Sequence, residues 1–195
     1  VLTLMYDDNH KCNITISQEA APSSADKLIK VIGGEATSEE TQGKDTDQNP
    51  LTLKMSYDGN KKTYFNSAFG QVSYPFSIRY ELEKGHTLNS IVYTPRTDSG
   101  NKWGSFDQFT VEVSTADKPD DFVKIGDYAR GNGVHTPFTI KLSKPVEDAK
   151  FVRFIINKAY EDRVSCAEME FYEASSNKFD PATIFADNMG LQLKA

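Results

Sequence analysis

Hydrophobic and polar residues alternate along most of the chain, with the period of two that is typical of β-strands. Residues 76–82, 109–114 and 167–172 each alternate in this way. Shorter apolar or alternating stretches lie at residues 28–32, 51–55, 88–94, 122–125, 138–142 and 151–156. Such alternation places one face of a strand on a core and the other face in solvent. The chain is therefore predicted to be rich in antiparallel strands.

Turn-forming residues separate these stretches, as in Asp58-Gly59, Lys84-Gly85 and Gly131-Asn132-Gly133. Many short strands with turns between them, and no helix-length periodic segment, predict an all-β sandwich or barrel. Residues 35–50 are acidic and lack apolar periodicity, so a long surface loop is predicted there. Only residues 181–194 show a weak helical stripe, which predicts a short C-terminal helix or tail.

The first twenty residues form a pattern of their own. Two β-prone stretches, residues 1–6 and 12–17, flank a polar turn at residues 7–11, and this predicts a β-hairpin. A lone hairpin is marginal in water, so it is expected to pack on a further domain. The small, polar residues that follow predict a linker.

Composition narrows the range of functions. The 22 Lys and Arg against 28 Asp and Glu give a net charge of −6, and no basic stripe suggests nucleic-acid binding. No apolar run approaches the roughly 20 residues of a membrane-spanning helix. The two cysteines, Cys12 and Cys166, match no zinc-ligand set, and the sequence leaves open whether they pair.

Catalytic motifs are largely missing from the sequence. The three histidines, His10, His86 and His135, have no spacing typical of a shared metal. There is no P-loop, dinucleotide fingerprint or nucleophile elbow. Carboxylate pairs such as Glu39-Glu40 lie in hydrophilic segments, where a solvated loop is the simpler interpretation; two carboxylates meeting across loops remain an alternative. The sequence therefore contains no recognisable catalytic motif, and an enzyme stays an alternative.

Three polar clusters are candidates for binding chemistry. Residues 58–67 supply Asp, Asn and Thr oxygens around a glycine turn, which suit a hard cation, although an ordinary β-turn that needs no metal is the simpler interpretation of this segment alone. Arg96 leaves a strand end into a polar loop, where it can recognise hydroxyls or carboxylates or form a surface ion pair. Glu168 enters the last alternating strand, and an exposed strand glutamate is its simplest interpretation.

The order of these segments resembles the discoidin, or coagulation-factor type C, superfamily, and within it most closely family 32 carbohydrate-binding modules. The segments that carry the resemblance are residues 58–67, 75–82, 91–96, 101–114, 151–154 and 167–171. The resemblance implies a galactose-binding-like jelly-roll β-sandwich with one structural Ca²⁺. The implied ligands are the side chains of Asp58, Thr63 and Glu168, with main-chain carbonyls near Tyr57, Asn60 and Ala167.

The resemblance also implies a sugar site in the loops at one end of the sandwich. Arg96 would donate to ring hydroxyls with its guanidinium open to solvent, Asn101 would assist, and Phe69 would offer a stacking face. Two positions depart from the family pattern: Asn66 stands where many members have His, and Trp103 stands where a Gly often follows the Asn. Trp103 and Tyr160 are further stacking candidates, with core packing as the alternative for the tryptophan.

The flanks resemble other families. Residues 13–20 resemble the closing strand of a BACON-type sandwich, and residues 182–194 resemble the junction before enhancin-like zinc metallopeptidases. These resemblances imply an exported Bacteroidetes protein, located extracellularly, at the cell surface or in the periplasm, whose signal lies outside this chain. The expected organisation is a BACON-like hairpin at 1–20, a linker at 21–27, the discoidin-like module at 28–175, and a linker at 176–195 leading to a further domain.

The predicted function is that of a non-catalytic, Ca²⁺-stabilised module, monomeric within a multidomain chain. It would bind terminal galactose or N-acetylgalactosamine of mucin-type glycoproteins and target an attached secreted hydrolase or peptidase to them. The alternative is a protein-interaction or spacer module that binds no sugar, because a fold alone does not fix a function.

Overall fold

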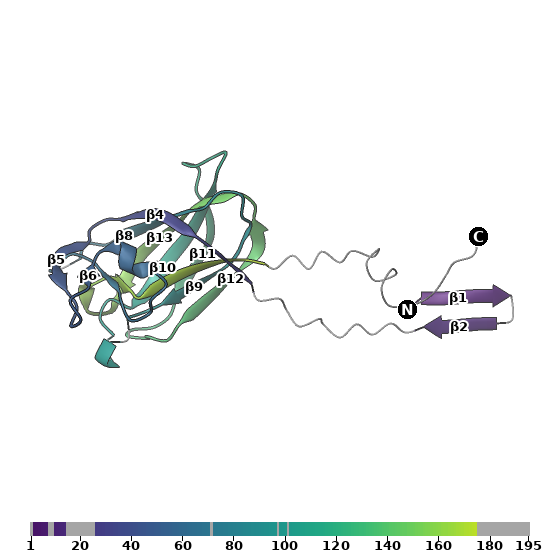
Figure 1. Cartoon of the computed structure of the whole chain (residues 1–195), viewed down its shortest axis with the longest axis horizontal. Coiled ribbons are helices and arrows are strands. Elements are labelled where there is room, and N and C mark those ends of the chain that lie inside the picture. Colours follow the sequence, from purple (N-terminus) through teal and green to yellow (C-terminus); the bar gives the residue numbers. More distant parts are fainter. Residues whose placement is uncertain are drawn as a thin grey trace. The chain divides into compact units, whose positions relative to one another are not determined.

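The computed structural model describes residues 2–7, 10–14, 26–70, 72–96, 98–100 and 102–174. Strands β1 (Leu2–Asp7) and β2 (His10–Ile14) pair antiparallel, with Leu4 opposite Cys12, so the N-terminal hairpin is confirmed (Figure 1). Residues Lys27–Ala174 form a separate compact unit. The helix predicted within 181–194 lies outside the described residues.

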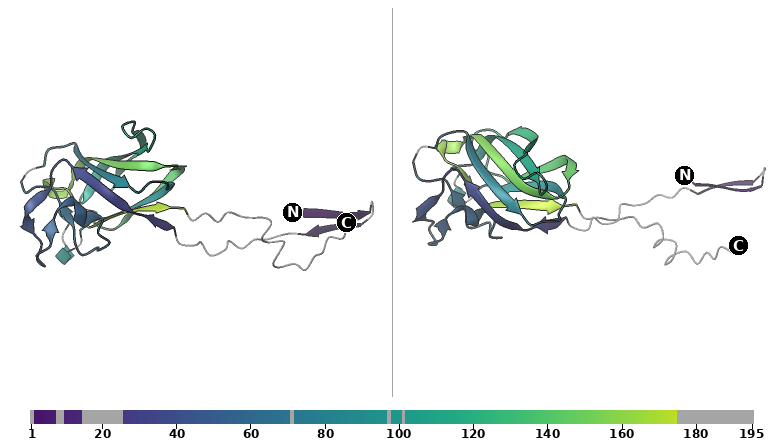
Figure 2. Two further views of the ribbon diagram at one scale, coloured as in Figure 1. Left: turned by 45° about the horizontal axis from the view of Figure 1, so that its top comes forward. Right: turned by 90° about the horizontal axis from the view of Figure 1, so that it is seen from above.

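The compact unit is a sandwich of two antiparallel sheets, which Figure 2 shows in two further views. The first sheet has the order β11-β10-β13-β8-β4, with strands Val123–Ala129, Phe106–Thr115, Ala149–Ala159, Phe76–Leu82 and Val31–Ala36. The second sheet has the order β12-β9-β15-β3, with strands Phe138–Val146, Leu88–Thr94, Glu168–Glu173 and Lys27–Ile29. The predicted all-β sandwich is confirmed.

The core lies between the two sheets and is rich in aromatic rings. β8 shows how the sequence produces it: every second residue from Phe76 to Leu82 is buried. Tyr80 of this strand packs edge-on against Phe154 of the same sheet, with ring centroids 6.1 Å apart. It also packs, with tilted rings, against Phe171 of the facing sheet, with centroids 5.5 Å apart. Because side chains alternate across a strand, the pattern of period two fixes which face meets the core.

The segment that precedes β8 differs from its prediction. Residues 35–50 were expected to form only a loop, but they contain β5 (Glu40–Lys44), which pairs with β6 (Pro50–Leu51). The apparent alternation at 51–55 is largely a 3-10 helix, η1 (Leu53–Ser56). The acidic residues Glu40 and Asp45 are buried there because backbone N–H groups satisfy their carboxylates.

One end of the sandwich is closed by short elements far apart in sequence. β7 (Phe65–Asn66) pairs with β14 (Ser165–Cys166), which places Asn66 opposite Ser165. Two further 3-10 helices, η2 (Asp98–Gly100) and η3 (Tyr160–Asp162), follow β9 and β13. This end, which we call the loop end, therefore brings together the segments that contain all the predicted binding residues inside the described part of the chain.

Candidate functional site

The four predicted metal ligands lie together at the loop end. The Gly59 N–H points at Glu168 Oε1 across 3.4 Å, so the early turn meets the start of β15. The Thr63 hydroxyl lies 2.8 Å from Asp58 Oδ2 and 2.7 Å from the Asn60 carbonyl oxygen. The side chain of Asn60 instead accepts from the Lys62 N–H, so only its carbonyl joins this group of oxygens.

Glu168 is the electrostatically unusual member of this group. Its side chain is almost fully buried, and its Oε2 has no hydrogen-bond partner among the described residues. Burial raises the pKa of Glu168 to about 7, and the Asp58 and Glu170 carboxylates add to the rise, while the Gly59 N–H and Lys61 oppose it. A nearby cation would favour the charged carboxylate and give the free oxygen a partner.

The donor set can be tested against the chemistry of calcium. Within the described residues, no three or more His, Cys, Asp or Glu side chains are grouped so that they could hold a metal. Among the described residues, Asp58 and Glu168 supply the carboxylates of the donor set, while the nearby Glu170 pairs with Lys61. Ca²⁺ also accepts carbonyl, hydroxyl and water oxygens, which Asn60 and Thr63 can supply in part. The residues therefore fit Ca²⁺, and they do not fit a metal that needs several His or Cys ligands.

Arg96 departs from its prediction. Its guanidinium was expected to face solvent, but the residue is only 7% exposed. Nε and Nη2 donate to the two carboxylate oxygens of Asp98 at 2.7 and 2.6 Å, and Nη2 also donates to the Tyr64 hydroxyl at 2.8 Å. The guanidinium carbon lies 3.9 Å from the centroid of the Tyr64 ring. Arg96 borders a cavity of about 300 Å³, but its charge is already neutralised by a carboxylate two residues away.

Two other predicted ligand residues do not present an open surface. Asn66 is 1% exposed, and its Nδ2 donates to the Ser67 carbonyl at 2.8 Å. It therefore lies beneath the surface, as pairing of β7 with β14 requires. Tyr160 is half-buried with its ring against Gly133, where a Cβ atom would lie 3.2 Å from the ring. Asn101 lies outside the described residues.

Phe69 and Trp103 are the predicted residues that remain open, with 56% and 44% of their surfaces exposed. The core-packing alternative for Trp103 is therefore wrong. The structure brings the two rings to one side chain that the sequence did not single out: the guanidinium carbon of Arg163 lies 5.7 Å from the Phe69 centroid and 5.0 Å from the Trp103 centroid. We call Phe69, Trp103 and Arg163 the aromatic–arginine cluster.

The backbone around this cluster is firmly held. The Phe69 N–H donates to buried Glu40 at 3.0 Å, and the Trp103 carbonyl accepts from the Ser165 hydroxyl at 2.5 Å. Gly104 has φ of +77°, and a Cβ there would lie 2.5 Å from the Ser165 nitrogen. Only glycine allows so close an approach, so the two segments lock Trp103 in place beside Arg163.

A family model for the F5/8 type C domain matches residues 35–170, which include the described loop end and both sheets except β3, most of β4 and the end of β15. The chain belongs to the F5/8 type C domain family. Comparison with curated protein sequences gives no match.

Solved structures share the fold of this F5/8 type C domain. CpGH89CBM32-5 from Clostridium perfringens, in complex with GalNAc-β-1,3-galactose, has a TM-score of 0.59 at 24% identity over 72% of this chain and 94% of its own. The family 32 module of C. perfringens NanJ, in complex with galactose, has a TM-score of 0.60 at 22% identity over 72% and 93%. A structure with the CBM32-1, CBM32-2 and M60 catalytic domains of C. perfringens ZmpB has a TM-score of 0.62 at 20% identity over 75% of this chain and 15% of its own.

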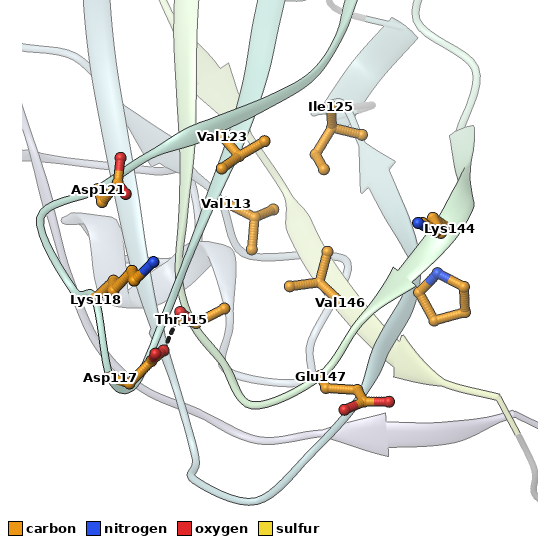
Figure 3. Close-up of a pocket in the computed structure, with 11 residues that line it drawn as sticks. Val113, Thr115, Asp117, Lys118, Asp121, Val123, Ile125, Lys144, Val146 and Glu147 are labelled. Atoms are coloured by element: carbon orange, nitrogen blue, oxygen red, sulfur yellow. Dashed lines mark hydrogen bonds between the residues drawn. The ribbon is translucent and has the colours of Figure 1, made fainter.

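A larger cavity of this F5/8 type C domain, of about 760 Å³, lies at the other end of β10 from Trp103. Figure 3 shows aliphatic side chains at its centre and charged groups around them: Val113, Val123, Ile125 and Val146, with Asp117, Lys118, Asp121, Lys144 and Glu147. None of its described lining residues is aromatic. A sugar ring usually stacks on an aromatic plane, so the aromatic–arginine cluster is the better candidate site.

No helix in the described residues is long and apolar enough to span a bilayer.

Proposed function

We propose that this F5/8 type C domain binds glycans through the aromatic–arginine cluster at its loop end. The observation that carries the proposal is the pair of exposed rings, Phe69 and Trp103, that contact one guanidinium. The C–H face of a pyranose packs on an aromatic plane, and an adjacent Arg donates hydrogen bonds to ring substituents. Such a domain acts by binding rather than by catalysis.

The chemical class of the ligand is supported by structural relatives. Two domains with this fold were solved with galactose or GalNAc-β-1,3-galactose. We therefore propose terminal galactose or N-acetylgalactosamine, as found on mucin-type glycoproteins, as the sugars to test first. Because the cluster is an exposed surface rather than an enclosed pocket, each site is expected to be weak and to gain strength from multivalent attachment.

The proposal includes a structural Ca²⁺ held by Asp58, Thr63, Glu168 and the carbonyl of Asn60. The free, buried Oε2 of Glu168 supports it. The ion would supply positive charge that ties the 58–63 turn to β15. It would act on the stability of the loop end and not as a direct contact of the sugar.

We also propose that the domain works as part of a longer secreted protein, a Bacteroidetes enzyme of the enhancin-like metallopeptidase type. The ZmpB structure supports this organisation because it joins two domains of this fold to an M60 catalytic domain in one chain. In such an enzyme the domain would raise the local concentration of glycoprotein substrate.

Calorimetric titration of the whole chain with galactose, N-acetylgalactosamine and their oligosaccharides, with Ca²⁺ present, tests the proposal. Phe69→Ala and Trp103→Ala should each weaken binding about tenfold, since one stacked ring contributes roughly 1–1.5 kcal/mol. Val123→Ala is the control, because Val123 is an exposed hydrophobic residue, 63% exposed, that lies at the other cavity. A folded protein that binds no such glycan would favour the protein-interaction or spacer alternative instead.

A further inference from the structure

Arg163 differs from the other arginines of the chain in its partners. Three of the five arginines form ion pairs: Arg79 with Glu35, Arg96 with Asp98, and Arg153 with Glu112. Arg130 donates to the Thr136 carbonyl and lies over two rings. Arg163 lies against the Phe69 and Trp103 rings, and within the described side chains no carboxylate lies within ion-pair distance of it.

Among the described side chains, none compensates the positive charge of Arg163. Lys102, directly before Trp103, is exposed and also forms no ion pair within the described part of the chain. Glu161 is exposed two residues before Arg163 but does not pair with it. In a chain with a net charge of −6, three arginines are paired with carboxylates, whereas half-buried Arg163 has no such partner among the described side chains. The two rings also exclude water from part of the guanidinium, which strengthens its interaction with an anion.

We propose that the aromatic–arginine cluster is selective for acidic sugars, and that Arg163 holds the carboxylate or sulfate ester of the sugar while Phe69 or Trp103 stacks on the ring. This inference rests on the proposed glycan-binding function and names the substrate class of that site. The planar guanidinium matches the two oxygens of such an anion with parallel N–H donors. Hydrogen bonds of this charged kind are about twice as strong as those to a neutral hydroxyl.

The cavity bordered by Arg96 is less suited to an acidic sugar, and this contrast supports the assignment to Arg163. Arg96 faces it with its charge neutralised by Asp98, and the cavity is also bordered by Asp45 and Asp47. These three carboxylates would repel an acidic sugar, although Lys61 and Lys62 border the same cavity. Among the described side chains of the loop end, the guanidinium of Arg163 is the one that lies beside exposed rings and has no carboxylate partner.

The test compares matched pairs of ligands that differ in one anionic group. The whole chain is titrated with a neutral galactose or N-acetylgalactosamine oligosaccharide, and with its sialylated, uronate-containing and 6-sulfated counterparts. Trp103 is the only tryptophan, so its fluorescence reports directly on the cluster, and calorimetry gives the affinities. We expect at least one acidic counterpart to bind about tenfold more tightly, and this preference to shrink as NaCl is raised. Tighter binding of the sialylated or uronate-containing ligand would show that a carboxylate is recognised, and tighter binding of the 6-sulfated ligand would show that a sulfate is recognised.

Variants decide whether Arg163 is responsible. Arg163→Gln should abolish the preference while neutral sugar still binds, and Arg163→Lys should lose most of it, because an ammonium group lacks the planar fork. Arg79→Gln removes the same charge from an arginine of the sandwich body and should keep the preference. Equal binding of acidic and neutral ligands by the wild type, or an unchanged preference in Arg163→Gln, would overturn this inference and leave the proposed function standing. Binding of neither class would overturn both.

Discussion

At the residue scale, the contrast between Arg96 and Arg163 shows how little a residue type reveals without its partners. Arg96 stands in a family-like motif, yet Asp98 and Tyr64 occupy its donors. Arg163 stands in no motif, yet it lies near two exposed rings. A charged group is available to a ligand only where the fold leaves it unpaired, and that depends on neighbours distant in sequence.

Glu40 provides a test at the same scale, because its buried carboxylate holds the segment that carries Phe69. It accepts N–H groups from Gln42 at 2.8 Å, Gly43 at 2.7 Å and Phe69 at 3.0 Å. The backbone N–H groups of Gly43, Phe69 and Gln42, in that order of effect, lower the pKa of Glu40 despite its burial. Glu40→Gln should reduce the free energy of unfolding by about 1–3 kcal/mol at pH 7, because an amide NH₂ would then face an N–H donor.

The pH dependence of that loss has a definite sign. A carboxyl whose pKa is lower in the folded state stabilises the fold above its unfolded pKa, and this contribution disappears as the pH falls through the folded pKa. The difference between wild type and Glu40→Gln in urea unfolding should therefore shrink on acidification below about pH 4. A difference that is constant from pH 7 to pH 3 would contradict the role given to this carboxylate.

At the scale of elements, the sequence predicts the strands of the sandwich better than its loop end. Strict alternation predicted β8, and β10 and β15 likewise, because each of these strands buries one face on the core. β5 escaped prediction because Glu40 is a buried acid that no apolar pattern reveals. Likewise, Phe69 and Trp103 could be proposed from a family resemblance, whereas Arg163 depends on a meeting of three segments that only the folded chain shows.

Gly104 tests how the elements of the loop end hold Trp103. Gly104→Ala should lower stability by about 1–3 kcal/mol, because it adds a Cβ 2.5 Å from the Ser165 nitrogen as well as strain from a φ of +77°. Gly100→Ala is the matched control, since Gly100 has a φ of +71° with no atom close to the added Cβ. Thermal unfolding should therefore show the larger loss for Gly104→Ala, accompanied by a shift in Trp103 fluorescence. Equal losses would mean that strain, and not the contact with Ser165, governs this turn.

At the scale of the whole domain, the contact between Gly59 and Glu168 spans 109 residues of sequence. It joins the turn at one edge of the loop end to β15, which lies in the middle of the second sheet. An ion bound at this contact would stabilise the native state without binding the unfolded chain to the same degree. At a free Ca²⁺ concentration about 100 times Kd, the gain is about 2.7 kcal/mol, which corresponds to about 5–10 °C in Tm for a domain of this size.

The last prediction is that Ca²⁺ raises the Tm of the wild type and that EDTA removes this rise. Variants of the acidic residues distinguish metal binding from a simple loss of packing. Glu168→Gln should remove the rise of Tm with Ca²⁺. In EDTA the same variant should be no less stable than wild type, because it replaces a buried acid whose pKa is raised to about 7 and whose Oε2 has no partner within the described residues. Glu170→Gln removes an acid from the same strand that pairs with Lys61, and it should keep the Ca²⁺ response. A wild-type Tm that is identical in Ca²⁺ and EDTA would exclude the metal site while leaving the aromatic–arginine cluster untouched, since no residue belongs to both.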